Sequence, residues 1–365
     1  MGYRILILIP KLDLSGPSRG SIALLNGLKD LGVDAEILPL NASANDISNA
    51  NMLLTEEKFF FKKIKKLQNY LNCFKSHSRQ PILVSFCLQA DFLALVACDR
   101  SHIISSVRGN LLENYSDDFR FIGKFLGFIH YWILRKFTVI TALNLQMKTE
   151  LLNYNKKTEL IPNFIDELNI PSIDQGASGI FKFVFVGSLS KRKAVIDLIH
   201  AFMPCIEAFP DTELNIIGDG PLKTEVENLI IKYKASASIK LHGFVSEPMS
   251  IVKRCDVFVL PSFSEGISRA AMEALFLGKR CIMQNVDGNA ELILTEKQGI
   301  LIENLNNLSS ELIKMRCSGR VRDIQRLPSN FRQKSCCQQF ISVFEKYFVL
   351  EKKILNIKKI NREGH

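Results

Sequence analysis

The sequence predicts an α/β protein in which two parallel sheets are each covered by helices. In both halves of the chain, short β-rich runs alternate with longer helical patterns, which is typical of parallel sheets. The 365 residues exceed what a single hydrophobic core usually holds, so two domains are expected. Between the halves, Pro162-Asn163, Pro171 and the glycines of residues 176–179 have the turn chemistry of a linker. We therefore predict domains at residues 1–168 and 178–330, followed by a helix and a basic tail over residues 331–365.

The individual strands are predicted from short apolar runs bounded by turn residues. In the first half they cover residues 3–9, 34–39, 82–86, 103–107 and 139–142, with helices over 21–31 and 116–136. In the second half they cover residues 181–186, 213–217, 239–241, 257–260, 279–283 and 299–302, with helices over 194–208, 222–235 and 268–276. A last helix is predicted over residues 330–355.

The net charge of +10 indicates an anionic partner. Nucleic acid is disfavoured, because the sequence has no zinc-finger spacing, no aromatic RNA-binding signature and no evident helix-turn-helix. The basic residues lie instead among apolar and aromatic ones in residues 58–74 and 119–137. Two interpretations stay open for these segments: contact with an anionic membrane surface, or amphipathic helices docked on their own sheet with lysines outward.

The cysteines and the apolar segments favour a cytoplasmic protein. None of the nine cysteines has the Cys-x-x-Cys spacing of a zinc or redox site, so free thiols in a reducing compartment are expected. The first residues form a short strand-like run rather than a secretory signal. The longest uncharged apolar stretch, residues 125–134, is too short to span a bilayer. We expect a cytoplasmic location, with or without attachment to the inner face of the membrane.

Two glutamates, Glu265 and Glu273, follow the buried strand predicted over residues 257–260. If the next helix begins near Gly266, its free N–H groups form an anion site at residues 266–268, with Glu265 at its mouth. Glu273 would then lie about 12 Å further along the helix axis, beyond the roughly 5–9.5 Å between paired carboxyls of a glycoside hydrolase. The pair suits the two ends of one long ligand, such as a nucleotide-sugar; the alternative is two solvated helix carboxylates.

Three further loops at predicted strand ends suit such a ligand. Residues 187–194 combine backbone N–H groups with three consecutive cations, which suits a diphosphate. Gly218 and Gly220 form a tight turn that allows close backbone approach, either to a ligand or within a simple strand-to-helix turn. Phe244 is predicted to present an aromatic face to a nucleotide base.

The first strand is joined to the first predicted helix by Ser15-Gly16-Pro17-Ser18-Arg19-Gly20, in which Gly16 lets backbone approach the ligand. This loop is not a Gly-x-Gly-x-x-Gly fingerprint, and no acidic residue lies where a dinucleotide ribose needs one, so a dehydrogenase is disfavoured. The Gly-x-x-x-x-Gly-Lys-Ser/Thr motif of P-loop NTPases is also absent.

In this order, the strand-end motifs resemble those of the retaining glycosyltransferases of family 4. That resemblance implies the GT-B fold, in which two Rossmann-like domains face each other across a cleft. The matching motifs are Ile161-Pro162-Asn163-Phe164-Ile165-Asp166, Val186-Gly187-Ser188-Leu189 with Lys193, Ile217-Gly218-Asp219-Gly220-Pro221, Leu241-His242-Gly243-Phe244-Val245, Pro261-Ser262 with Glu265 and Glu273-Ala274, and Asp287-Gly288-Asn289-Ala290-Glu291-Leu292.

The resemblance implies roles for individual residues. Lys193 would neutralise the donor diphosphate, Glu273 would hydrogen-bond the ribose hydroxyls, and Glu265 would act at the donor sugar and its phosphate. The rest of the implied donor site comprises Gly16, Ser188, Arg192, Gly218, Gly220, Phe244, Gly266, Ile267 and Ser268. The family implies no metal and no other cofactor, because cations and a helix N-terminus replace Mg²⁺ in stabilising the leaving phosphate.

Two positions depart from the family pattern. Ser188 stands where many members have an arginine that contacts the diphosphate, so either Arg192 compensates or the site carries less charge. Arg108 follows a first-half strand where many members have a histidine facing the donor sugar. An arginine there stabilises charge but cannot act as a base, because its pKa lies above 12. We predict Glu265 and Arg108 as the catalytic pair.

The sequence therefore predicts a glycosyltransferase that moves a sugar from a UDP- or GDP-linked donor to an acceptor with retention of configuration. The acceptor is expected at residues 16–19 and 108–110 and is predicted to be a lipid-linked saccharide of cell-surface polysaccharide assembly, such as O-antigen, lipopolysaccharide or capsule. The alternatives are a GT-B epimerase or phosphorylase, and a basic binding protein without catalytic activity.

Overall fold

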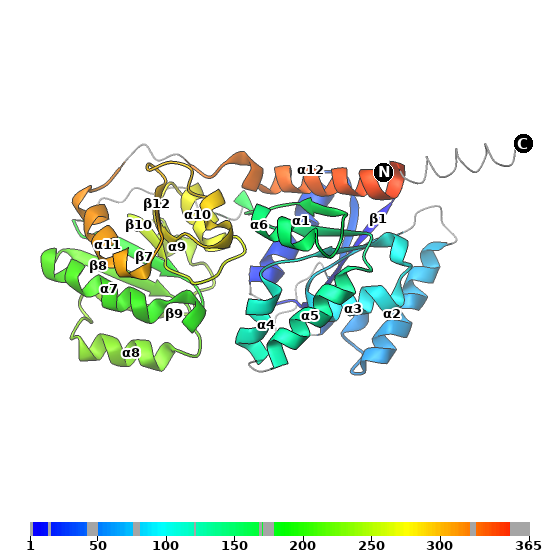
Figure 1. Cartoon of the computed structure of the whole chain (residues 1–365), viewed down its shortest axis with the longest axis horizontal. Helices are drawn as coiled ribbons and strands as arrows, with labels where there is room; N and C mark the ends of the chain where they lie inside the picture. The colour runs from blue at the N-terminus through cyan, green and yellow to red at the C-terminus, as the bar shows by residue number, and fades with distance from the viewer. Residues whose placement is uncertain are drawn as a thin grey trace, which may run out of the picture. The chain divides into compact units, whose positions relative to one another are not determined.

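The structure is a computed structural model that describes residues 3–13, 16–41, 50–75, 81–119, 122–167, 170, 179–321 and 326–350. The chain divides into two compact units, each an α/β layer structure (Figure 1). The described residues up to Phe164, together with those from Arg332 onward, form unit 1, and Ile165–Phe331 forms unit 2. Most of the predicted linker, residues 168–169 and 171–178, lies outside the described residues.

Unit 1 is built on a six-stranded sheet in the order β2-β1-β3-β4-β5-β6, and all neighbouring strands are parallel. Its strands are buried along nearly their whole length, which is typical of a parallel sheet covered by helices on both faces. The strands are β1 (Arg4–Lys11), β2 (Asp34–Asn41), β3 (Pro81–Ser85), β4 (Ile103–Ser106), β5 (Val139–Ala142) and β6 (Thr158–Leu160). The helices before the second unit are α1 (Gly16–Asp30), α2 (Phe60–Lys75), α3 (Cys87–Ala97), α4 (Leu111–Phe119), α5 (Gly123–Leu134) and α6 (Leu145–Leu151).

Unit 2 repeats the architecture with a six-stranded parallel sheet in the order β12-β11-β10-β7-β8-β9. Its strands are β7 (Phe181–Val186), β8 (Thr212–Ile217), β9 (Ile239–Gly243), β10 (Val257–Leu260), β11 (Arg280–Gln284) and β12 (Gly299–Ile302). Its helices are α7 (Val195–Ala208), α8 (Lys223–Lys232), α9 (Met249–Val252), α10 (Arg269–Phe276) and α11 (Leu308–Cys317). From β7 the chain adds strands on one side, and from β10 it adds them on the other.

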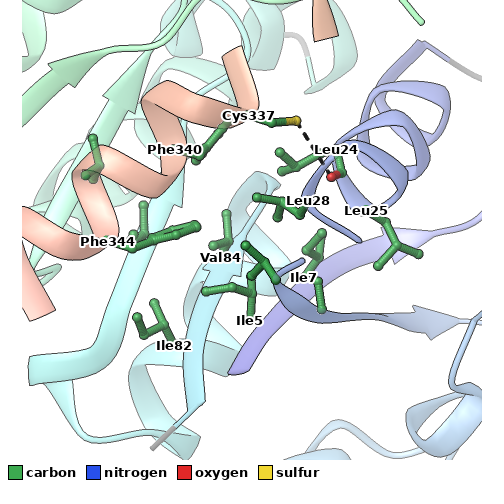
Figure 2. Close-up of a cluster of buried hydrophobic side chains, with 14 of the residues drawn as sticks. Ile5, Ile7, Leu24, Leu25, Leu28, Ile82, Val84, Cys337, Phe340 and Phe344 are labelled. Atoms are coloured by element: carbon green, nitrogen blue, oxygen red, sulfur yellow. Dashed lines mark hydrogen bonds between the residues drawn. The ribbon is translucent and has the colours of Figure 1, made fainter. Parts of the chain in front are cut away.

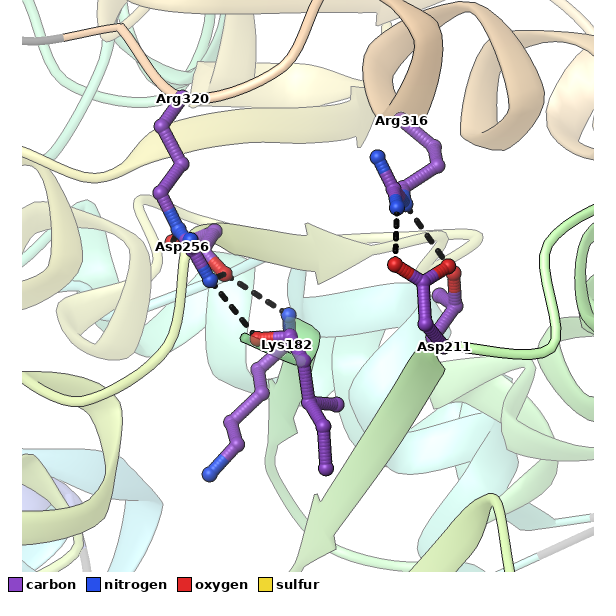
Figure 3. Close-up of polar contacts among 7 residues, drawn as sticks. Lys182, Asp211, Asp256, Arg316 and Arg320 are labelled. Atoms are coloured by element: carbon purple, nitrogen blue, oxygen red, sulfur yellow. Dashed lines mark hydrogen bonds and ion pairs between the residues drawn. The ribbon is translucent and has the colours of Figure 1, made fainter. Parts of the chain in front are cut away.

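Ionic contacts attach the end of α11 and the residues after it to the start of two strands of unit 2 (Figure 3). Arg316 lies 2.6 Å from an oxygen of Asp211, beside the first residue of β8. Arg320 donates to Asp256 at 2.8 Å, and the other oxygen of Asp256 accepts from the backbone N–H of Lys182 at 2.8 Å. Charged groups therefore add to the apolar packing of Phe181 and Val257 at the amino ends of these strands.

The last helix, α12 (Gln333–Phe344), packs on unit 1 and not on the unit that precedes it in the chain. Phe340 and Phe344 are buried in the same core as β1, α1 and β3 (Figure 2). Gln333 donates to the carbonyl of Ala23 at 2.7 Å. Gly27 permits the close approach of α1, because a Cβ there would lie 2.6 Å from the Cys337 sulfur. The prediction separated residues 331–365 from both domains; in the structure this apolar helix completes the core of unit 1.

The helix predicted over residues 116–136 is instead two helices, α4 and α5, which pack against each other. Their approach depends on Gly123, where a Cβ would lie 2.0 Å from the carbonyl oxygen of Tyr115. The single predicted helix ran through Asp117, Asp118 and Gly123, although a glycine within a helical pattern is a signal of a break. The last predicted helix also changes character, because α12 gives way to a π-helical turn over Glu345–Leu350, and residues 351–355 lie outside the described residues.

Candidate functional site

The order of the strands in unit 2 places the candidate site between β7 and β10. These two strands are neighbours, and the chain leaves them toward opposite edges of the sheet. Ligands of open α/β sheets bind outside the carboxyl ends of the strands at such a switch point. The loop of residues 187–194 follows β7, and the loop of residues 261–268 follows β10. The fold thus brings together the two loops that the sequence predicted for a diphosphate and for the donor sugar.

The two loops are joined by backbone and side-chain contacts. The backbone N–H of Phe263 donates to the carbonyl of Arg192 at 2.8 Å, and the Arg192 guanidinium donates to the carbonyl of Ser264 at 2.7 Å. Lys193 Nζ donates to the carboxylate of Glu265, and the Arg192 guanidinium lies 3.9 Å from the same oxygen. Three of the predicted site residues, Arg192, Lys193 and Glu265, therefore form one cluster.

This cluster has more positive than negative charge, and its pair of Lys193 and Glu265 has little access to water. Glu265 is 7% exposed as a residue, and the Lys193 side chain is 12% exposed. Burial of an ion pair costs solvation free energy that the pair's own attraction repays only in part. With two cations beside one carboxylate, the cluster has a net positive charge, so it favours an added anion such as a phosphate.

Helix α10 begins at Arg269, one residue after the start of the helix predicted over residues 268–276. The start near Gly266 that the predicted anion site assumed does not occur. Ser268 is the N-cap: its backbone is extended and its hydroxyl accepts from the N–H of Ala271 at 3.3 Å. Serine is among the preferred N-cap residues, because its hydroxyl replaces a missing helical acceptor. Gly266, Ile267 and Ser268 therefore precede the first helical turn, and the separation of about 12 Å between Glu265 and Glu273 does not apply, because it counted both as helical.

Glu273 lies on the second turn of α10 and is paired with Arg269, whose guanidinium is 3.7 Å away. Both side chains are 13% exposed. The alternative of two solvated helix carboxylates is therefore wrong for both glutamates. Arg269 was missed by the sequence analysis, although its position four residues before Glu273 is the ordinary signal of a helical ion pair.

Gly218 and Gly220 serve a close approach between two loops of unit 2. A Cβ at Gly218, whose φ is +146°, would lie 1.8 Å from the carbonyl oxygen of Gly187. A Cβ at Gly220 would lie 2.7 Å from the backbone nitrogen of Leu189. The sequence left open whether these glycines allow close approach to a ligand or within a strand-to-helix turn. The structure supports the close approach between the strand-to-helix turns. Their predicted contact with a donor stays a prediction.

Two predicted donor residues, Ser188 after β7 and Phe244 after β9, are exposed. The Ser188 hydroxyl lies 3.2 Å from that of Ser190, so this position adds no positive charge to the site. Phe244 follows β9 and is 59% exposed. Such an exposed ring is available to stack on a planar group, as predicted for the nucleotide base.

In unit 1, Arg108 follows β4 and has two fixed neighbours. Its guanidinium carbon is 4.6 Å from the centre of the buried Phe86 ring, and one nitrogen donates to Asn163 at 3.4 Å. A cation over an aromatic face is held by the ring quadrupole. Phe86 was not predicted as a site residue, although it follows β3 directly and so lies at the same sheet edge.

Gly16 is the first residue of α1, so residues 16–20 form the first turn of a helix and not the predicted loop. The buried Ser18 fixes this start, since its hydroxyl donates to the carbonyl of Lys11 at 2.9 Å. A backbone approach to a ligand at Gly16 stays a prediction, and Ser15 lies outside the described residues.

A buried polar network beside the Arg108 loop was also missed. Asp91 accepts from Ser85 and Ser105, which lie on β3 and β4, and its carboxylate is 2.6 Å from His130 Nε2 on α5. His130 Nδ1 is 2.9 Å from the Tyr115 hydroxyl on α4. The network ties three helices to the strand ends that precede the Arg108 loop. The signal in the sequence is an aspartate within the mostly apolar run of α3.

The sequence and the fold were compared with known proteins. Residues 174–314 match the family described as glycosyl transferases group 1. A UDP-Gal:alpha-D-GlcNAc-diphosphoundecaprenol alpha-1,3-galactosyltransferase of Escherichia coli is 32% identical over 204 residues, which are 52% of this chain and 50% of that protein. An N-acetylgalactosamine-N,N'-diacetylbacillosaminyl-diphospho-undecaprenol 4-alpha-N-acetylgalactosaminyltransferase of Campylobacter jejuni is 28% identical over 185 residues, covering 49% of this chain and 50% of the other. The matches thus span about half the length of these curated relatives.

The fold extends the likeness over nearly the whole chain. The pneumococcal O-GlcNAc transferase GtfA, solved in complex with UDP and GlcNAc, superposes with a TM-score of 0.72 at 11% identity, covering 96% of this chain and 100% of that one. This likeness confirms the predicted α/β, GT-B fold class. The matched residues 174–314 lie in unit 2, which also holds the cluster of Arg192, Lys193 and Glu265. Unit 2 therefore belongs to the glycosyl transferases group 1 family, as its strand-end motifs predicted.

Proposed function

We propose that this protein is a glycosyltransferase that transfers a sugar from a nucleotide-sugar to a saccharide acceptor with retention of configuration, in the assembly of a cell-surface polysaccharide. The observation that carries the proposal is the cluster of Arg192, Lys193 and Glu265 at the switch point of the sheet in unit 2. Retention rests on the resemblance to family 4.

In this proposal the cluster supplies the charge that the leaving diphosphate requires. Lys193 and Arg192 stabilise the negative charge that develops on the phosphate oxygens, and Glu265 is placed to contact the donor sugar. No metal is required, because preorganised cations in a water-poor site stabilise the developing charge. Full activity in the presence of EDTA is the corresponding test.

The donor and acceptor are proposed from the relatives. The name of the E. coli relative specifies UDP-Gal, and GtfA was solved with UDP, so we propose a UDP-sugar donor. Both bacterial relatives act on diphosphoundecaprenol-linked saccharides according to their names, so we propose an acceptor of that kind. An epimerase or phosphorylase would yield free sugar, an epimer or a sugar phosphate instead of an extended acceptor.

The donor model predicts that Glu273→Gln weakens UDP binding by about tenfold or more, because a hydrogen bond to a charged group contributes about 1.5–3 kcal/mol. Isothermal titration with UDP measures the effect, and thermal unfolding checks that the fold is intact. Glu227→Gln, an exposed change on α8, is the matched control and should bind UDP as the wild type does. Unchanged UDP binding in Glu273→Gln would show that this carboxylate does not contact the nucleotide.

We also propose that α5 binds an anionic membrane surface, where a lipid-linked acceptor would be met. Four large apolar side chains at helical spacing are exposed along this segment: Ile122, Phe125, Phe128 and Trp132. We call the three aromatic side chains among them, Phe125, Phe128 and Trp132, the α5 aromatic face. The cations Lys124, Arg135 and Lys136 lie in the same segment, and Lys136 Nζ is 5.7 Å from the Trp132 ring. Aromatic groups flanked by cations suit the interface of an anionic bilayer.

The alternative, helices docked with their lysines outward, accounts for only part of these segments. On α2, Leu67 and Leu71 are buried, but Phe61 is 83% exposed. Lys63 is not outward: it is buried, and its Nζ donates to the carbonyl of Leu40 and to Asn41. Burial lowers the pKa of Lys63. Among the described residues, no helix is long and apolar enough to cross a bilayer.

If the α5 aromatic face binds the membrane, the triple variant Phe125→Ser, Phe128→Ser, Trp132→Ser should bind vesicles more weakly than the wild type. Each side chain that enters the interface contributes up to about 1.5–3 kcal/mol, so binding to vesicles of phosphatidylglycerol and phosphatidylethanolamine should fall by at least about tenfold. Co-sedimentation measures it. Ile231→Ser, an equally exposed apolar site on unit 2, is the control and should have no effect. Equal binding by the triple variant and the wild type would exclude the α5 aromatic face as a membrane surface.

A further inference from the structure

One face of the sheet in unit 2 is polar along three adjacent strands. In register, Lys182 of β7 pairs with Glu213 of β8, and Asn215 of β8 pairs with Lys240 of β9. His242 lies two residues further along β9 on the same face. Parallel sheets are normally apolar on both faces because helices cover them. Lys240 and His242 are exposed on the edge strand β9, where polar residues are usual, but the polar residues of the inner strands β7 and β8 are not explained by packing.

These side chains line a cavity of about 350 Å³, which is within the usual range of ligand pockets. This face of the sheet is covered by the four-residue helix α9 and the residues that follow it. We call the cavity the β7–β9 pocket; its lining residues are Lys182, Glu213, Asn215, Lys240, His242, Ser250, Ile251, Arg254 and Cys255.

A hydrogen-bonded chain forms the base of the pocket. Asn215 is only 5% exposed, and its amide nitrogen donates to Glu213 at 2.8 Å. Its amide oxygen lies 2.7 Å from His242 Nε2. Since the oxygen can only accept, His242 Nε2 carries the proton. The Glu213 carboxylate, the single carboxylate of the pocket, is thus held in place by its hydrogen bond from Asn215.

The cations of the pocket outnumber its carboxylate by three to one: Lys182, Lys240 and Arg254 face Glu213. Lys240 Nζ donates to the carbonyl of Ser236 at 2.9 Å. Within the part of the chain that the structure describes, the Lys182 ammonium and the Arg254 guanidinium make no hydrogen bond or ion pair. Lys182 is bonded to Asp256 only through its backbone: its N–H donates to the Asp256 carboxylate, and its carbonyl accepts from the Asp256 N–H at 2.7 Å. Its side chain extends away from that carboxylate (Figure 3).

We propose that the β7–β9 pocket binds a small phosphorylated molecule. Arginine presents a planar fork that matches phosphate oxygens, and lysines add point charges, so Arg254 with Lys182 suits a phosphate group. Burial raises the pKa of the Cys255 thiol to about 12, so at neutral pH the thiol is protonated and adds no negative charge to the lining.

The β7–β9 pocket is distinct from the proposed donor site. Lys182, Glu213 and Lys240 are each the second residue of their strand, so they lie at the amino ends of the strands. The cluster of Lys193 and Glu265 lies beyond the carboxyl ends. The inference goes beyond the proposed transferase activity and does not depend on it.

Calorimetric titration of the full chain with inorganic pyrophosphate and with glucose 1-phosphate tests the proposal. The Lys193→Met background weakens the donor site, which would also attract phosphates. In this background, Lys182→Met with Arg254→Met should weaken binding of at least one probe by about tenfold or more, since two charge-assisted contacts are lost. Both positions are at least partly exposed, so the fold should persist, as thermal unfolding would verify.

The charge-matched control is Lys232→Met with Lys234→Met, which removes two exposed lysines elsewhere on unit 2. It should leave binding unchanged. The proposal is overturned if neither probe binds in the Lys193→Met background, or if the pocket variant and the control variant bind equally well. The result with UDP decides the donor site separately, because UDP binding should depend on Lys193 and not on Lys182 or Arg254.

Discussion

Changing Glu265 to glutamine is expected to reduce sugar transfer by about 100-fold or more, because a group that stabilises charge in the transition state contributes on the order of 10² to 10³ in rate. The same change should tighten UDP binding by about tenfold, equivalent to about 1.4 kcal/mol. In the free protein the carboxylate engages both Lys193 and Arg192. Removing its charge leaves both cations for the diphosphate, while the shape of the side chain is retained.

Steady-state transfer assays and UDP titration measure the two effects separately. Lys193→Met should lose both transfer and UDP binding, because it removes a cation and leaves Glu265 buried with one fewer partner. Lys191→Met, an exposed change in the same loop, is the matched control and should alter neither. A Glu265→Gln variant that transfers sugar at the wild-type rate would contradict the assigned role. Weaker UDP binding in that variant would contradict the idea that Glu265 and the diphosphate compete for the same cations.

Phe344→Ala is expected to lower the free energy of unfolding of unit 1 by about 3–5 kcal/mol, the usual cost of truncating a buried phenylalanine. Phe344 is fully buried, and its ring lies 6.0 Å from those of Tyr3 and Phe340. Its loss would open a cavity between α12 and β1 (Figure 2).

Urea unfolding followed by circular dichroism measures the loss. Phe61→Ala, on the exposed side of α2, is the matched control and should change the stability by less than about 0.5 kcal/mol. A comparably small loss for Phe344→Ala would show that α12 does not contribute to the core of unit 1.

Local sequence signals predicted the strands of unit 2 well, although they missed the helices α9 and α11. The strands over residues 181–186, 257–260 and 299–302 agree with β7, β10 and β12 to the residue, because each is a short apolar run bounded by turn chemistry. The motifs that follow β7 and β10 predicted Lys193 and Glu265 as residues of one site. These signals did not predict how the charged side chains of the two loops pair, because the contact between Arg192 and Ser264 joins residues far apart in the chain.

Unit 1 was predicted less well, for physical reasons that particular residues illustrate. The break between α4 and α5 depends on the passage of Gly123 against the backbone of Tyr115, which no apolar period reveals. The network of Asp91 and His130 joins helices that the sequence did not place together. The strand β6 has only three residues, too few to show a period. Long-range packing, rather than local propensity, decides these features.

The return of α12 to unit 1 has a consequence for the order in which the protein is made. A chain synthesised from its N-terminus carries all of residues 165–331 before the helix that completes the earlier unit exists. Unit 2 has its whole sequence continuous and can fold while translation continues, since domains generally fold as units. Unit 1, which contains the first residues to be synthesised, is therefore the last unit to be completed. Until α12 has been synthesised, the apolar surface of α1 and β1 that it covers stays exposed to solvent.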